Sequence, residues 1–285
     1  MPSVPLSPLR YPGGKTRFVP HLTQWLGDVS YHPRWVVEPF CGGASVSLGM
    51  LAADAAHAAV IADADPLVAQ FWMAATEHTE DLIDVMMSEP VTVERWKHWK
   101  TLDVSRADVV TVAMKTLFLN RTTFSGLIRH GSVLGGIDQD EKIANGEVVK
   151  YPVGCRFNKV SLANSLRRIG EWHDKGRLLA WFCPYEETLD AAPRNGMVYL
   201  DPPYVEKSDQ LYGRLFTEDC HRILAESAYA VAEARKVIIS YDDLPLIRDL
   251  YSNEPMHIDT PTWSYGMGKN KQSREVLIHN LGARP

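Results

Sequence analysis

Short apolar runs alternate with helical patterns near both ends of the chain. Apolar runs at 35–40 and 59–62 are each followed by a helical pattern, at 46–56 and 67–77. Further strand-like runs recur late in the chain, at 178–183, 197–201, 237–241 and 276–280, and helical patterns at 217–235 and 244–251 separate most of them. This alternation predicts one doubly wound α/β sheet to which both ends of the chain contribute.

The middle of the chain breaks this alternation. Helical patterns continue to about Arg121, with 107–119 the clearest, and residues 124–153 have the Gly-rich, polar and basic composition of a hairpin with loops. Another helical pattern follows at 161–173. We therefore expect a sheet domain made of residues 1–66 and 176–285, with residues 67–175 inserted as a mostly helical unit that carries a hairpin.

Composition sets limits on location and on the kinds of site. No apolar run approaches the roughly 20 residues that a membrane span needs, and the first 17 residues are too rich in Pro and Gly for a signal peptide. We expect a cytoplasmic protein. The four cysteines lie far apart without a Cys-x-x-Cys pair, which indicates neither a zinc site nor a disulfide framework.

Charge is distributed unevenly along the chain. The net charge of −5 argues against a polyanion as partner, yet residues 120–178 contain ten Lys and Arg against six Asp and Glu. A local basic face in the insert could therefore still meet nucleic acid. The alternative is an ordinary solvated surface.

The segment Asp201-Pro-Pro-Tyr204 is the most specific chemical signal in the sequence. It directly follows the strand-like run 197–200, and ligands of open α/β sheets bind beyond the carboxyl ends of strands. An aromatic exocyclic amine is a poor nucleophile, because its lone pair is delocalised into the ring. The Asp201 carboxylate and the Pro202 carbonyl could each accept one of its N–H groups, while Tyr204 offers a flat face for stacking. The alternative is a proline-rich turn that closes a strand.

A second signal is the glycine turn from Glu38 to Ser45, which lies between a predicted strand and a predicted helix. Backbone can approach a ligand closely at such a turn, but the G-x-G-x-x-G spacing of a pyrophosphate site is absent. Asp63 ends the next strand, where an acid commonly binds ribose hydroxyls. Together they predict a site for an adenosyl ligand without phosphates, with capping of the next helix as the alternative for Asp63.

A third signal is Arg10-Tyr-Pro-Gly-Gly-Lys-Thr16 near the amino terminus. It resembles a phosphate loop only superficially, because Leu9 stands where a Walker motif needs its first glycine and no strand precedes it. Nucleotide hydrolysis is not indicated. A glycine pair that holds Lys15 near an anionic group is one interpretation, and a plain turn is the other.

With these motifs, the chain resembles the Dam-type DNA adenine methylases, the N6-adenine methyltransferases with the α order of motifs. The resemblance rests on Tyr11 to Lys15, Glu38 to Ser45, Asp63, Asn120 to Arg129, Phe157-Asn158 and Asp201 to Tyr204. It implies a Rossmann-like sheet that uses S-adenosylmethionine, an insert that recognises double-stranded DNA, and methyl transfer to the N6 amine of a flipped adenine.

The resemblance also implies roles for individual residues. Asp201, Pro202 and Tyr204 would be catalytic. The cofactor would contact Tyr11, Lys15, Glu38, Phe40, Gly42, Gly43, Asp63, Tyr185 and Asp201. DNA would contact Arg10, Asn120, Arg121, Phe124 and Arg129, with the aromatic side chain as a wedge in the base stack. For Phe124 the alternative is core packing, and for Arg129 a surface charge.

Departures from the family pattern limit these implications. Ser125 stands where Dam enzymes have Asn, so GATC specificity does not carry over, and Pro184 replaces an acid that commonly meets the cofactor's adenine. The segment 240–243 receives no role. An RNA adenine methyltransferase and a non-catalytic DNA-binding relative remain as alternatives. We expect a monomer, without a metal site, and a cognate restriction endonuclease is one conceivable partner.

Overall fold

The computed structural model describes residues 6–11, 13–205, 216–260 and 275–282. The chain forms two compact units. The first consists of residues 1–14, 42–44 and 63–182, and the second of residues 15–41, 45–62 and 183–285. The first unit therefore contains all of residues 67–175, and it also includes the amino-terminal segment and the middle of the glycine turn.

The second unit is built on a mostly parallel sheet. Its strands are β1 (Trp35–Glu38), β2 (Ala58–Asp63), β4 (Gly196–Leu200), β5 (Val237–Asp242), β6 (His257–Asp259) and β7 (Glu275–His279). They run in the order β2-β1-β4-β5-β7-β6, and β7 is antiparallel to both of its neighbours. Because β1 pairs directly with β4, the strand order reverses between them, and this is the point where open α/β sheets bind ligands.

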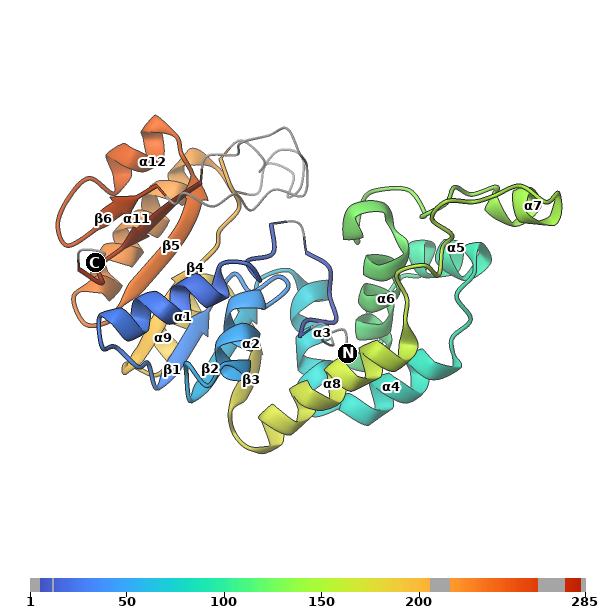
Figure 1. The fold of residues 1–285 in the computed structure, drawn as a ribbon, viewed down its shortest axis with the longest axis horizontal. Coiled ribbons are helices and arrows are strands. Elements are labelled where there is room, and N and C mark those ends of the chain that lie inside the picture. Colours follow the sequence, from blue (N-terminus) through green and yellow to red (C-terminus); the bar gives the residue numbers. More distant parts are fainter. Residues whose placement is uncertain (1–5, 12, 206–215, 261–274, 283–285) are drawn as a thin grey trace. The chain divides into compact units, whose positions relative to one another are not determined.

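Helices cover both faces of this sheet. They are α1 (Val19–Asp28), α2 (Ser45–Ala52), α9 (Tyr185–Ala191), α11 (Glu218–Ala232) and α12 (Pro245–Leu250). In Figure 1, α1 and α2 lie in front of the sheet, and α9 and α11 lie behind it. Double coverage explains why every residue of β4 is buried and why this strand reads as a continuous apolar run.

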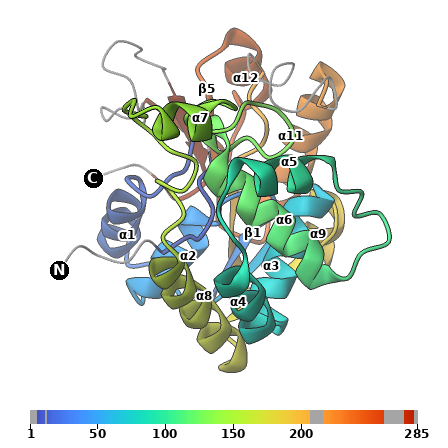
Figure 2. The same cartoon turned by 90° about the vertical axis from the view of Figure 1, so that its right-hand side faces the viewer.

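The first unit is mostly helical. It contains α3 (Pro66–Glu77), α4 (Thr79–Ser88), α5 (Val93–Thr101), α6 (Val109–Thr122), the 3₁₀ turn η1 (Phe124–Gly126), α7 (Gln139–Ala144), α8 (Lys159–Asp174) and the strand β3 (Leu178–Phe182). Helices α3, α4, α6 and α8 lie side by side as a bundle (Figures 1 and 2). Side-chain caps from Asp65, Thr92, Asp108 and Asn158 begin four of these helices.

The predicted α/β fold is confirmed, whereas residues 124–153 differ from the predicted hairpin with loops and contain helix α7. Where a hairpin was expected, the structure has a single antiparallel bridge between Thr123 and Val133, with η1 in the loop between them. The last predicted strand, at 276–280, is β7. In the described part of the chain, no helix is both long and apolar enough to cross a membrane.

Candidate active site

Asp201 is the centre of a polar cluster in the second unit, immediately after β4. Lys15 Nζ donates to both carboxylate oxygens of Asp201 at 2.8 Å and to the Tyr204 hydroxyl at 3.0 Å. The Lys15 side chain is 3% exposed, whereas that of Asp201 is 24% exposed. The glycine segment at the amino terminus therefore brings Lys15 to an anionic group, as the sequence indicated, and that group is Asp201 of the same chain.

Tyr204 contributes both a hydroxyl and a ring to this cluster. Lys15 Nζ lies 5.3 Å from the ring centroid, close enough for a cation–π contact. Burial, followed by the negative charge of Asp201, raises the pKa of Tyr204 well above its usual value, so the hydroxyl stays protonated. Pro202, between them, is buried. The three residues predicted to be catalytic are thus part of one compact corner.

Glu38 ends β1, the strand beside β4. One of its carboxylate oxygens accepts a hydrogen bond from the Ser47 backbone N–H at 2.9 Å, at the start of α2. Burial raises the pKa of Glu38 to about 7, and the nearby Asp201 carboxylate acts in the same direction. Glu38 and Asp201 therefore mark the carboxyl ends of the two strands between which the strand order reverses.

Phe40, two positions after Glu38, forms an aromatic pair with Tyr185. The rings of Phe40 and Tyr185 stack with centroids 5.2 Å apart, and Phe216 meets Phe40 edge-on at 6.1 Å. Tyr185 is the first residue of α9 and is buried. The structure thus brings together two predicted cofactor contacts that are 145 positions apart in the sequence.

Asp63 and the glycine turn form a separate group in the first unit. The Asp63 carboxylate accepts hydrogen bonds from the backbone N–H groups of Gly42 and Asp65, both at 2.9 Å. Burial raises the pKa of Asp63 to about 6. Asp63 does not cap the following helix, because Asp65 is the N-cap of α3. The capping alternative is therefore wrong for this residue.

The glycine turn also explains the position of Tyr11. Gly42 has a φ of +44°, and a Cβ atom there would lie 2.7 Å from the Tyr11 ring. Only glycine permits this backbone and this contact together. Gly43 is buried beside it. The close approach that the sequence predicted at this turn is made by an aromatic side chain of the protein.

Asn120 was predicted to contact DNA, but in the structure its side chain binds backbone groups of the protein itself. It is fully buried at the end of α6. Its side-chain oxygen accepts from the Arg10 N–H at 2.7 Å, and its amide nitrogen donates to the carbonyls of Arg10 and Gly126 at 2.8 and 2.9 Å. All polar atoms of this amide face the protein, so Asn120 connects the amino-terminal segment to the η1 turn.

The Arg121 side chain also binds backbone groups of the amino-terminal segment. Its guanidinium donates to the carbonyls of Pro8 and Ser7, at 2.6 and 3.4 Å. Burial, followed by the charges of Arg10 and Arg156, lowers the pKa of Arg121 to about 10. The prediction that Asn120 and Arg121 lie on the DNA surface is corrected for Asn120, and Arg121 serves first as a tether for residues 7–8.

Phe124 and Arg129 lie on the η1 turn and just beyond it. Phe124 is 64% exposed, which excludes the core-packing alternative. Arg129 is half-exposed and forms an ion pair with Asp65, with Nη2 to Oδ1 at 2.6 Å. Ser125 between them has a φ of +58°, a conformation that only a few per cent of non-glycine residues adopt. The turn thus presents an aromatic ring and a cation on one short segment.

Two residues of the Asp201 cluster were missed by sequence reasoning. Ser240, on β5, donates to Asp201 Oδ1 at 2.8 Å, and the Tyr199 hydroxyl lies 2.9 Å from Ser240 Oγ. Both are fully buried. The available signal was a polar residue in each of two otherwise apolar strands, at a depth where such groups need partners.

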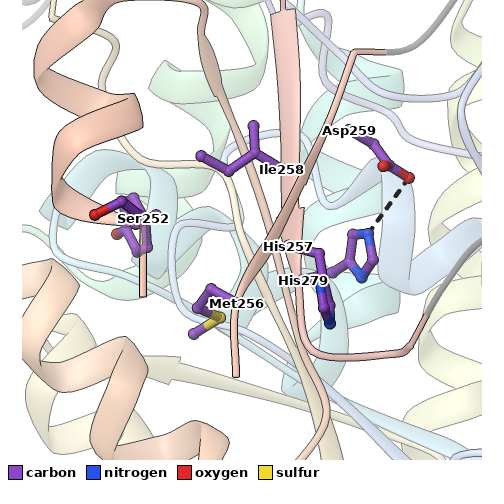
Figure 3. Close-up of a pocket in the computed structure, with 7 residues that line it drawn as sticks. Ser252, Met256, His257, Ile258, Asp259 and His279 are labelled. Atoms are coloured by element: carbon purple, nitrogen blue, oxygen red, sulfur yellow. Dashed lines mark hydrogen bonds and ion pairs between the residues drawn. The ribbon is translucent and has the colours of Figure 1, made fainter. Parts of the chain in front are cut away.

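A surface pocket elsewhere in the second unit takes no part in this cluster. Its lining consists of Tyr251, Ser252, Met256, His257, Ile258, Asp259 and His279 (Figure 3). His279 Nε2 lies 3.4 Å from Asp259 Oδ2. None of the predicted site residues lines the pocket. The pocket and the cluster at the ends of β1 and β4 therefore share no residue.

Comparison with known proteins agrees with this geometry. The family described as D12 class N6 adenine-specific DNA methyltransferase matches residues 11–135 and 153–267. The Retron Ec67 DNA adenine methylase of Escherichia coli is 27% identical over 97% of this chain and 91% of its own. For a DNA adenine methylase of Vibrio cholerae, the identity is 25% over 92% of each chain. The type II methyltransferase M1.LlaDCHI of Lactococcus lactis is 22% identical over 96% of this chain and 94% of its own. The chain belongs to the family of D12 class N6 adenine-specific DNA methyltransferases.

Proposed function

We propose that this DNA adenine methyltransferase takes its methyl group from S-adenosylmethionine and acts on an adenine turned out of duplex DNA. The observation that carries the proposal is the Lys15–Asp201–Tyr204 cluster beyond β4. It combines a partly exposed carboxylate with a protonated tyrosine, in a place where sheets of this kind bind ligands.

The residues in each unit suit such a cofactor chemically. In the second unit, the Glu38 carboxyl can meet a cationic ammonium group, and the Phe40–Tyr185 pair can meet a flat purine. In the first unit, Asp63 is an acid of the kind that binds ribose hydroxyls, and the glycine turn and Tyr11 lie beside it. S-adenosylmethionine, when bound, supplies an electrophilic methyl group on a sulfonium.

The protein's part in the reaction is to make the amine nucleophilic. We assign the Asp201 carboxylate and the Pro202 carbonyl as acceptors for the two N–H groups of the adenine amine, which keeps the lone pair on nitrogen. The carboxylate also stabilises the positive charge that develops as the methyl group arrives. Tyr204 supports the base by stacking.

The DNA contacts are assigned to the first unit. Phe124, exposed on a turn held by Asn120, is the proposed wedge that enters the base stack. Arg10 and Arg129 are the proposed contacts to phosphate or guanine. A monomeric state, a cytoplasmic location and a cognate restriction endonuclease stay predictions. The RNA alternative has no support among the relatives found.

Substitution of Asp201 tests the assignment. Asp201→Ala should lower the methylation rate at least 100-fold, because one acceptor that stabilises developing charge is lost. Asp201→Asn keeps the shape but not the charge and should also be strongly impaired. The measurement is transfer of labelled methyl groups to duplex DNA, followed by mapping of the modified adenines.

DNA affinity separates a catalytic defect from a folding defect. Both Asp201 variants should keep DNA dissociation constants close to that of the wild type. Asp28→Ala, which removes an exposed acid from the end of α1 in the same unit, serves as control and should retain full activity. Methylation at the wild-type rate by Asp201→Ala would refute the proposed role, and transfer to RNA alone would refute the DNA substrate.

A further inference from the structure

Two consecutive hydrogen bonds connect Tyr199 to Asp201 through Ser240. Ser240 Oγ donates to Asp201 Oδ1 at 2.8 Å, and the Tyr199 hydroxyl lies 2.9 Å from Ser240 Oγ. Tyr199 belongs to β4 and Ser240 to β5, which are paired parallel strands, and both side chains are fully buried. Both residues are therefore held in the buried interior of the sheet.

The bond from Ser240 to Asp201 fixes the donors along this chain of hydrogen bonds, and the Tyr204 hydroxyl is a further hydrogen-bond partner of Ser240. A serine hydroxyl carries a single hydrogen, and an ionised carboxylate carries none. Ser240 therefore donates its hydrogen to Asp201, and the Tyr199 hydroxyl must donate to Ser240 Oγ. The direction runs from Tyr199 through Ser240 to Asp201, and each donor makes the next one a better donor.

The acceptor sites of Asp201 can be counted in the same way. A carboxylate offers about four lone-pair sites, two on each oxygen. Oδ1 accepts from both Ser240 and Lys15, whereas Oδ2 accepts from Lys15 only. Among the described residues, the remaining acceptor site of Asp201 is thus on Oδ2.

We propose that Ser240 and Tyr199 are positioning residues for methyl transfer, which fix the Asp201 carboxylate so that Oδ2 accepts the N–H of the adenine amine. The proposal rests on the catalytic role assigned to Asp201. Lys15 contacts both oxygens and cannot distinguish them, and the terminal torsion of an aspartate is broad. Ser240 contacts one oxygen only and therefore sets the orientation of the carboxylate plane.

Three variants test the proposal: Ser240→Ala, Tyr199→Phe and the double variant. The measurement is the single-turnover methylation rate with saturating S-adenosylmethionine and duplex DNA, so that product release does not mask the chemistry. Ser240→Ala should lower this rate roughly 10- to 100-fold, because a small misplacement of a catalytic group is costly. Tyr199→Phe should lower it less, since Ser240 can still donate.

The rate of the double variant tests whether Tyr199 acts on Asp201 through Ser240, an arrangement that we call the relay. If it does, the losses of the two single variants do not add. Once the Ser240 hydroxyl is absent, the path from Tyr199 through Ser240 to Asp201 is interrupted, so the double variant should react at the rate of Ser240→Ala. The cofactor dissociation constant of the two single variants should stay near that of the wild type, whereas the melting temperature should fall for Ser240→Ala, because the buried Tyr199 hydroxyl loses its partner. Multiplicative losses in the double variant, or a wild-type rate for Ser240→Ala, would overturn the relay.

Asp201→Asn, measured in the same assay, separates this proposal from the one on which it rests. If Asp201→Asn is inactive while Ser240→Ala reacts at the wild-type rate, the relay is wrong and the catalytic role of Asp201 stands. If Asp201→Asn retains the wild-type rate, the assignment of Asp201 fails, and the relay fails with it.

Discussion

At the scale of single residues, the burial of Glu38 predicts that the stability of the protein depends on pH. Burial raises its pKa from 4.5 to about 7, so the folded protein binds a proton more tightly than the unfolded chain does. The stabilising contribution is complete below pH 4.5 and is lost as the pH rises to about 7. At about 1.4 kcal/mol for each pKa unit, the loss is on the order of 3 kcal/mol.

Glu38→Gln should remove this dependence, because the amide oxygen can still accept from the Ser47 N–H and carries no charge. The unfolding free energies of both proteins should be measured by denaturant titration at pH 5 and pH 8. The variant should gain stability relative to the wild type on going from pH 5 to pH 8. An equal change in both proteins would show that Glu38 does not titrate in this range.

Residue positions were predictable where they follow from the local sequence, and not where they depend on distant packing. The position of Asp201 directly after an apolar strand was enough to predict its place at the carboxyl end of that strand. The burial of Asn120 was not predictable, because it depends on Arg10, which lies 110 positions away in the chain. A polar motif alone does not indicate whether its amide faces DNA or the backbone of the same protein.

At the scale of elements, the ion pair at the N-terminus of α3 predicts an effect on DNA binding. Asp65 caps this helix through Leu67 N and also holds Arg129 in an ion pair. Asp65→Asn should keep the cap but release Arg129, so affinity for a duplex of random sequence should rise up to about fivefold, the equivalent of the roughly 1 kcal/mol that such a pair is worth at most. Asp65→Ala should also lose about 1 kcal/mol of stability.

A matched substitution controls for net charge in this experiment. Asp174→Asn removes the same charge from the exposed end of α8 in the same unit. Dissociation constants from fluorescence anisotropy should change for Asp65→Asn and hardly for Asp174→Asn. Equal changes would mean that only overall charge matters, and that the pair does not restrain Arg129.

Elements were predictable to the extent that their own sequence defines them. All strands from β1 to β5 follow from apolar runs, because buried parallel strands carry an unbroken apolar signal. Helix α1 was missed, since its N-cap, Phe18, makes no side-chain cap, and α9 has only seven residues. The expected hairpin is a single bridge between Thr123 and Val133, and the η1 turn lies in the loop between them, with positive φ at Ser125 and Gly126.

At the scale of the whole molecule, the sequence shows where basic residues are concentrated, and the structure shows which of them lie close together. The chain carries −5 overall, with the excess of basic residues in 120–178. Within the first unit, Arg10 and Arg121 lie within electrostatic reach of Arg156, and burial followed by the Arg156 charge lowers the pKa of Arg10. Arg10 Nη1 is buried and has no hydrogen-bond partner among the residues that the structure describes. Such a group is costly in the free protein, and an approaching phosphate would relieve the cost.

This arrangement predicts how DNA binding responds to salt. Each phosphate contact releases counterions, so the logarithm of the affinity falls linearly with the logarithm of the salt concentration. Arg10→Gln should weaken binding and reduce the slope by about one, without lowering the melting temperature. Arg34→Gln, an exposed substitution before β1 in the second unit, should leave the slope unchanged. If the two variants show the same slope in titrations from 50 to about 200 mM salt, Arg10 does not contact the phosphate backbone, and the local basic face does not explain how an acidic protein binds DNA.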